Sequence, residues 1–209
     1  MSPNPDIPTG LSRNRRTAAR AGARRTQKTQ DALRQAFFAL IRASGYDAVA
    51  IGDIVASANV GRSTFYEHYR SKDDILRASM AHLLAVLADS IGHEQPPASL
   101  NRVTAHFWEN RRLANAVFTG TARRALLRTH TATIQERLVS LAREHRRRPA
   151  LPFGLAARQI AEAQIVLLHA WLTSSTFCPS ETLAEALHAS SRAAALALIG
   201  APLAAPRAP

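Results

Sequence analysis

The sequence of 209 residues contains one cysteine, no long apolar run and no segment that resembles a secretion signal. With Cys178 alone, an intrachain disulfide and a cysteine metal cluster are both excluded, which fits a reducing compartment. No apolar run approaches the ~20 residues that a membrane span needs, and the N-terminus has no apolar core followed by a cleavage site. We therefore expect a cytoplasmic protein with no membrane partner.

Patterns that would indicate catalysis or metal binding are also missing. The sequence has no nucleophile elbow, no phosphate-cradling glycine loop and no paired carboxylates in an apolar setting. His93 and His145 each lie beside a glutamate in the chain, but adjacent residues point apart on a helix. The sequence therefore predicts neither an enzyme nor a metal site, and it suggests no cofactor.

The composition is that of an all-α protein with a polyanionic partner. Apolar residues make up 46% of the chain and aromatic residues 6%, and alanine and the aliphatic residues dominate. The net charge of +12 suits nucleic acid. It is uneven, because residues 1–28 hold seven Lys or Arg against one Asp, whereas residues 29–92 hold six against seven acidic residues. Residues 93–209 are basic again, with fourteen against seven.

These patterns divide the chain into four segments. We predict a basic, disordered arm over 1–27, a helix-turn-helix domain over 28–72, a helical regulatory and dimerisation domain over 73–200, and a frayed tail over 201–209. The third segment begins with a connecting helix over 73–92. The arm, which includes Arg24 and Arg25, is either a solvated tail or a DNA contact in a neighbouring minor groove.

The stretch from residue 51 to residue 76 is the most informative part of the chain. Its pattern predicts a helix over about 51–58, a turn at Asn59-Val60-Gly61, and a second short helix over about 62–69. A third helix then starts after the capping residue Ser71. Short helices in this order, with a polar face on the second, are typical of a helix-turn-helix that enters the major groove.

The letters VGRSTFYEHYRSKDDIL, from Val60 to Leu76, resemble the signature of the tetracycline-repressor (TetR) family of bacterial regulators. The resemblance is specific over about residues 28–80 and only architectural beyond them. It implies a homodimer. Each subunit would have an N-terminal three-helix DNA-binding domain and a C-terminal domain that holds a ligand cavity and the dimer interface.

The resemblance also implies roles for particular residues around the second short helix. Three positions would touch base edges and nearby phosphates, two would grip phosphates, and one lysine would clamp the DNA backbone; they are, in that order, Arg62, Ser63 and Thr64, then Tyr66 and His68, then Lys72. Gly61, which precedes the helix, belongs to the same DNA-binding set, as do Arg24 and Arg25 of the arm. His68 is otherwise an ordinary surface histidine.

Two positions depart from the family pattern, and two others are assigned to the core. The family commonly has Thr or Ser where this chain has Ala50, and a polar or basic residue where it has Gly52. The second helix would then make fewer DNA contacts, for which the arginine-rich arm could compensate. Phe65 and Tyr69 are i,i+4 partners that the family places in the core.

In the C-terminal half, the candidate cavity residues are Phe107, Trp108, Phe118 and Trp171. Each of them is otherwise ordinary core packing. The last two long helices, expected over about 154–176 and 180–199, would form the dimer interface. Small residues at 189–191 and 193–195 permit close helix approach. The apolar area would be buried either against the domain or against the same helices of the partner, and it comes from Ile160, Leu167, Leu168, Trp171, Leu183 and Leu187.

Taken together, the sequence predicts an all-α, two-domain transcriptional regulator that binds a palindromic operator as a homodimer and responds as a repressor to an unknown small-molecule effector. The alternative is a DNA-binding protein without small-molecule input, either architectural or controlled by a partner. The arginines of the C-terminal half are either solvated or favour an anionic ligand.

Overall fold

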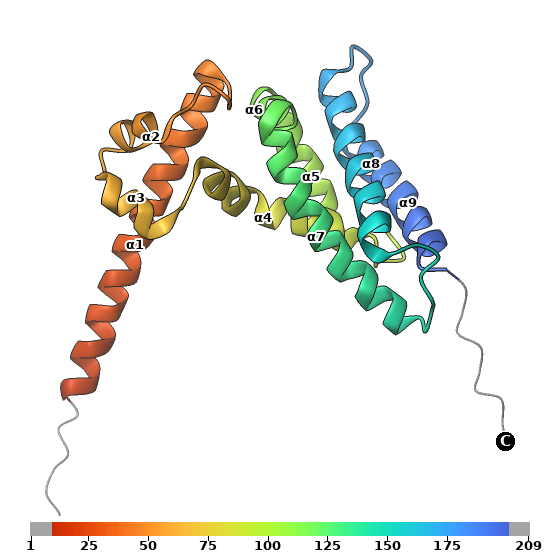
Figure 1. Cartoon of the computed structure of the whole chain (residues 1–209), viewed down its shortest axis with the longest axis horizontal. Coiled ribbons are helices and arrows are strands. Elements are labelled where there is room, and N and C mark those ends of the chain that lie inside the picture. Colours follow the sequence, from red (N-terminus) through yellow and green to blue (C-terminus); the bar gives the residue numbers. More distant parts are fainter. Residues whose placement is uncertain (1–9, 201–209) are drawn as a thin grey trace, which may run out of the picture.

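The computed structural model describes the backbone of residues 10–200 and the side chains from residue 22 onward (Figure 1). This part of the chain is helical and contains no strand, as the sequence predicts. None of its helices is long and apolar enough to cross a membrane. The helices are α1 (Gly10–Ser44), α2 (Ile51–Ser57), α3 (Arg62–His68), α4 (Lys72–Ser90), α5 (Ala98–Glu109), α6 (Arg111–Val117), α7 (Gly120–Glu144), α8 (Phe153–Thr173) and α9 (Ser180–Leu198).

The first three helices share a small apolar core. Leu33, Phe37 and Ile41 recur every four residues, so they line one face of α1, and all three are buried. Ile54 of α2 and Phe65 of α3 are fully buried against that face. The α1 helix ends at Gly45, whose φ of +80° is the left-handed conformation expected at a helix C-terminus.

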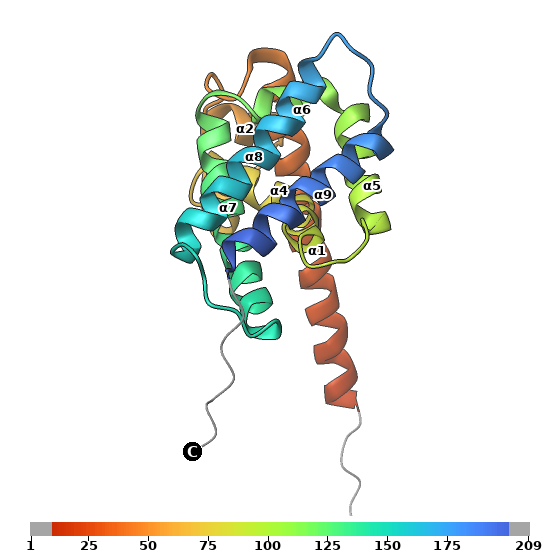
Figure 2. The ribbon, with the colours of Figure 1, turned by 90° about the vertical axis from the view of Figure 1, so that its right-hand side faces the viewer.

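The N-terminal arm is a correction to the sequence analysis. From Gly10 onward the segment expected to be disordered is the first part of α1, and residues 1–9 lie outside the described part. Figures 1 and 2 show this part of α1 projecting away from the other helices. Residues 10–27 have no apolar stripe, but they are rich in Ala and Arg, which are strong helix formers. Extending a helix that is already packed also avoids the cost of nucleation.

The α4 helix connects the head, by which we mean α1–α3, to the remaining helices (Figure 1). Its start is capped as predicted, because the Ser71 hydroxyl accepts a hydrogen bond from the Asp74 N–H at 3.2 Å. The Asp74 carboxylate accepts from the N–H of Arg70 at 2.9 Å, one residue earlier than in a standard capping box. Farther along, α4 buries Leu84 and Leu87 against the C-terminal helices.

The C-terminal helices enclose the larger part of the apolar cluster, which we call the second core. The α7 helix packs against both α4 and α8, and α9 packs against α5 and α8. A buried chain of hydrogen bonds crosses this core. His130 Nε2 lies 2.7 Å from Gln164 Oε1, and Gln164 Nε2 donates to the Leu87 carbonyl at 3.2 Å and to the Ser191 hydroxyl at 2.9 Å. One amide therefore links α4, α7, α8 and α9.

The apolar residues of the last two helices are buried against their own domain, which is one of the two alternatives that the sequence leaves open. Five of the six are buried within this subunit and Leu167 is half-buried; the five are Ile160, Leu168, Trp171, Leu183 and Leu187. Helical periodicity identifies an apolar stripe but not what covers it. Here α5, α6 and α7 lie against α8 and α9 and cover these stripes.

Candidate DNA-binding interface

The α3 helix has one buried side and one exposed side. Phe65 is fully buried, whereas Tyr66, the next residue, is 55% exposed. Arg62 and Ser63 are exposed, and the other polar residues of the predicted set are half-buried, namely Thr64 and His68. Because Phe65 anchors the inner side of α3 in the core, the opposite side presents a row of hydrogen-bonding side chains to solvent.

The start of α3 is open. Gly61 occupies the N-cap position with an extended φ of −74°, and its carbonyl accepts from the Phe65 N–H at 3.1 Å. The left-handed residue of the turn is Asn59, with a φ of +52°. A side chain at Gly61 would approach the hydroxyls of Ser63 and Thr64, at 3.6 and 3.9 Å from its Cβ. Glycine therefore leaves both hydroxyls free of a neighbouring side chain.

Gly52 has a structural explanation that the sequence analysis missed. A Cβ on this residue would lie 3.3 Å from Nη2 of Arg62. The Arg62 guanidinium therefore lies over the first turn of α2, in space that a polar or basic side chain would otherwise occupy. Ala50 caps nothing with its side chain, but its N–H donates to the Asp53 carboxylate at 3.1 Å. The two departures from the family pattern thus leave room for Arg62 and keep the start of α2 hydrogen-bonded.

Lys72 has contacts that the family pattern does not indicate. Its ammonium donates to the carbonyls of Tyr46, Asp47 and Val49 at 2.9, 3.2 and 2.9 Å. It also lies 4.7 Å from the centre of the Tyr46 ring. An ammonium has three N–H donors, so all three are used on the loop between α1 and α2. A phosphate contact by Lys72 would require one of these hydrogen bonds to open.

The same loop contacts the C-terminal helices. The Tyr46 hydroxyl donates to the Asp73 carboxylate, and Arg128 of α7 lies 3.4 Å from the same carboxylate. Thr121, at the start of α7, donates to Asp47. Burial raises the pKa of Tyr46, and the hydrogen bond to Asp73 raises it further. The loop that Lys72 holds therefore joins the head to α7.

The remaining predicted residues lie away from α3 or in the second core. Arg24 and Arg25 are exposed on the projecting part of α1. The rings of Phe107 and Phe118 are both buried, with their centres 5.3 Å apart. Trp108 instead pairs with Trp171, at 4.9 Å. Successive residues on a helix point about 100° apart, so Phe107 and Trp108 lie on different sides of α5. The Phe107–Phe118 pair and the Trp108–Trp171 pair are therefore separate.

Comparison with known proteins identifies the helix-turn-helix. The family described as bacterial regulatory proteins, tetR family, matches residues 33–79, which include α2, α3 and the start of α4. Residues 33–79 of the chain therefore form a TetR-family helix-turn-helix domain. A similar curated protein is the HTH-type transcriptional regulator YxbF of Bacillus subtilis (strain 168), at 33% identity over 69 residues. That match spans 32% of this chain and 18% of YxbF.

Solved structures share the fold of most of this chain. A TetR transcriptional regulator from Streptococcus agalactiae has a TM-score of 0.54 at 23% identity, over 83% of this chain and 98% of that one. A TetR-family regulator from Syntrophomonas wolfei has a TM-score of 0.56 at 16% identity, over 81% and 96%. At these identities the similarity establishes the fold. The family is one of transcriptional regulators and not of enzymes, in agreement with the sequence-based prediction.

Proposed function

We propose that this chain is a sequence-specific transcriptional regulator whose α3 helix enters the major groove. The observation that carries the proposal is the exposure of Arg62, Ser63 and Tyr66 on a helix that Phe65 anchors in the core. Arg62 can bond guanine O6 and N7 together, and a serine hydroxyl can bond a base edge or a phosphate. The Tyr66 hydroxyl suits a phosphate oxygen.

Other members of the predicted set would support this contact. Thr64 and His68, at the half-buried edges of α3, would bind phosphates beside the bases read by Arg62. We assign Lys72 to positioning, because its ammonium holds the loop before α2 through three carbonyls. Arg24 and Arg25 would follow the DNA beyond the groove that α3 occupies.

The dimer interface would be the outer face of α8 and α9, which faces the viewer in Figure 2. On α8 this face contains Leu155 and Val166, which are 61% and 54% exposed. The other exposed, uncharged residues at the same helical spacing are Gln159, Ala163 and Ala170 on α8, and Thr182, Ala186, Ala189, Ser190, Ala193 and Ala197 on α9. Small side chains allow two helix pairs to approach closely around a two-fold axis. Such a dimer would bind a palindromic operator with half-sites ~10 bp, or a multiple of that, apart.

Ligand-responsive repression would act through α4. This helix begins at the Lys72 and Asp73 contacts with the loop, and its Leu87 carbonyl accepts from Gln164 in the second core. A ligand that moves α4 would therefore move the DNA-binding head. The ligand can change operator affinity at most by the ratio of its own affinities for the two positions of the head.

A second candidate is a DNA-binding protein without small-molecule input. It is favoured by the charge of the first 28 residues and by the exposure of Arg24 and Arg25 on the projecting part of α1. Such a protein would bind phosphates with little sequence preference and with a steep dependence on salt. Removal of residues 1–25 would then abolish most of the affinity, whereas an α3-led regulator would keep its sequence preference.

Selection of bound sequences from random duplex DNA at physiological salt separates the two candidates. We expect an inverted repeat with the wild type, and relaxed preference at one base of each half-site with Arg62→Ala, since a bidentate contact supplies about 1–3 kcal/mol of discrimination. Arg124→Ala, which removes an exposed arginine of α7, is the matched control and should select the wild-type repeat. No enriched sequence with any of the three proteins would favour the nonspecific binder.

A further inference from the structure

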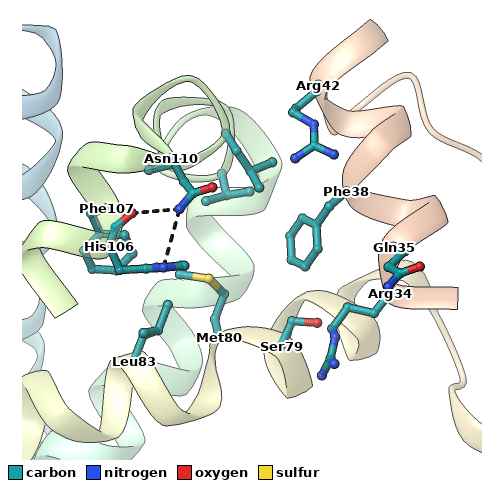
Figure 3. Close-up of a pocket in the computed structure, with 13 residues that line it drawn as sticks. Arg34, Gln35, Phe38, Arg42, Ser79, Met80, Leu83, His106, Phe107 and Asn110 are labelled. Atoms are coloured by element: carbon teal, nitrogen blue, oxygen red, sulfur yellow. Dashed lines mark hydrogen bonds between the residues drawn. The ribbon is translucent and has the colours of Figure 1, made fainter. Parts of the chain in front are cut away.

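A cleft separates α1 of the DNA-binding head from α4, α5 and α6 (Figure 3). Its volume is about 380 Å³, which is within the range of sites for small organic molecules. Most of its wall is apolar. Phe38 of α1 lies on one side, and Met80, Leu83, Phe107, Leu113 and Val117 lie on the other. Phe107 is the one predicted ligand-binding residue that lines this cleft.

The side chain of Phe38 shows that the head leaves apolar surface unburied here. Phe37, its neighbour in the chain, is fully buried in the core of the head. Phe38 is half-buried, and its ring is directed across the cleft toward α4 and α5 (Figure 3). An apolar body placed between this ring and Met80 would remove surface of both from water, which is favourable.

The polar groups of the cleft include two cations and a hydroxyl without a partner, beside the neutral side chains of Gln35, His106 and Asn110. Arg34 and Arg42 lie four residues before and after Phe38, so all three share one face of α1. Arg34 pairs with Asp31 at 2.6 Å, whereas Arg42 forms no ion pair with any residue of the described part. The Ser79 hydroxyl lines the cleft and is buried without a hydrogen-bond partner. A ligand with an acceptor group would satisfy this donor.

We propose that the cleft binds an amphipathic organic anion, with its acid group at Arg42 and its apolar body between Phe38 and Met80. A guanidinium without an ion-pair partner beside an apolar wall suits a carboxylate or sulfonate, because it offers two parallel N–H donors. A cationic ligand would meet Arg34 and Arg42 with like charge. The chemistry therefore selects the sign of the ligand as well as its apolar character.

The position of the cleft gives this ligand control over the head. One wall belongs to α1 and the other to α4, α5 and α6, so the ligand's affinity depends on their separation. If operator binding changes that separation, ligand and operator affinities must change by the same factor. This second step rests on the proposed function, whereas binding in the cleft does not.

A pair of fluorescent probes tests the binding step on the full chain without DNA. 8-Anilinonaphthalene-1-sulfonate carries an acid group, and N-phenyl-1-naphthylamine is the same ring system without it. We expect Arg42→Gln to weaken the sulfonate about tenfold, the effect of one charge-assisted hydrogen bond at a partly open site, and to leave the neutral amine within about twofold. Leu113→Trp should fill the cleft and weaken both probes, and Arg124→Gln is the matched charge control.

Equal sulfonate affinity for wild type, Arg42→Gln and Leu113→Trp would overturn the proposal, because the probe would then bind elsewhere. Far-ultraviolet circular dichroism and the melting temperature of each variant check that it is folded. The regulatory step is tested by repeating the sulfonate titration with the selected operator at saturation, where an unchanged affinity would refute the coupling. Failure of the operator selection would leave the probe result in place, and loss of probe binding would leave the operator result in place.

Discussion

At mildly acidic pH we expect the fold to lose stability through His130, whose imidazole is fully buried between α7 and α8. Gln164 directs its amide N–H groups to the Leu87 carbonyl and the Ser191 hydroxyl, so its oxygen accepts from His130 Nε2. The neutral ring then carries its proton on Nε2. A second proton would have to sit on Nδ1, which is buried and has no partner within the described part of the chain.

Burial lowers the pKa of His130 from 6.5 to about 4, although the hydrogen bond to Gln164 acts in the opposite direction. In the window between these pKa values the unfolded chain binds a proton that the folded chain does not. Stability is therefore complete above pH 6.5 and is lost as the pH falls toward 4. The full pKa shift corresponds to about 3 kcal/mol in the free energy of unfolding, of which about 2 kcal/mol is lost by about pH 5.

Urea unfolding, followed by circular dichroism at about pH 7.5 and about pH 5, measures this loss. His130→Gln keeps a donor for Gln164 but cannot be protonated, so its free energy of unfolding should fall by about 2 kcal/mol less than that of the wild type. Titrating carboxylates are common to both proteins and cancel in the comparison. The exposed His82 provides the matched control, and His82→Gln should behave as the wild type. An equal acid-induced loss in His130→Gln would refute the argument.

Three further predictions concern the head and the dimer. Lys72→Met should lower the free energy of unfolding by about 2 kcal/mol in urea, because three carbonyls lose a charged donor; a loss below about 0.5 kcal/mol would show that these bonds are not formed in solution. Gly52→Ala should raise stability by roughly 0.5 kcal/mol. It should also weaken binding to the selected operator about threefold, because its Cβ would lie 3.3 Å from Arg62 Nη2 and push the guanidinium outward from α2; unchanged affinity would contradict this placement. Ala163→Arg should sediment as a monomer while Ala132→Arg, on the exposed side of α7, stays dimeric, and dimers in both would reject the proposed interface.

The helix-turn-helix could be predicted because its determinants are local. The apolar spacing of α1, the left-handed Gly45 and the Ser71 cap each act within a few residues of the chain. The arm was wrongly predicted to be disordered, because it lacks an apolar stripe. The helix propensity of its alanine and arginine residues is sufficient to extend α1 back to Gly10. The last two helices could also be predicted, because Pro152 and Pro179 directly precede α8 and α9.

The sequence by itself determined the all-α class, the TetR-family head and the outward row of polar residues on α3. Only the tertiary structure decided the partners of these elements. Lys72 contacts carbonyls from 23 to 26 positions earlier, and Gln164 contacts a carbonyl 77 positions away. The cleft at Phe38 and Arg42 likewise exists only where α1 faces α4, α5 and α6. Periodicity shows which residues share a face, but the packing of the whole chain determines what that face contacts.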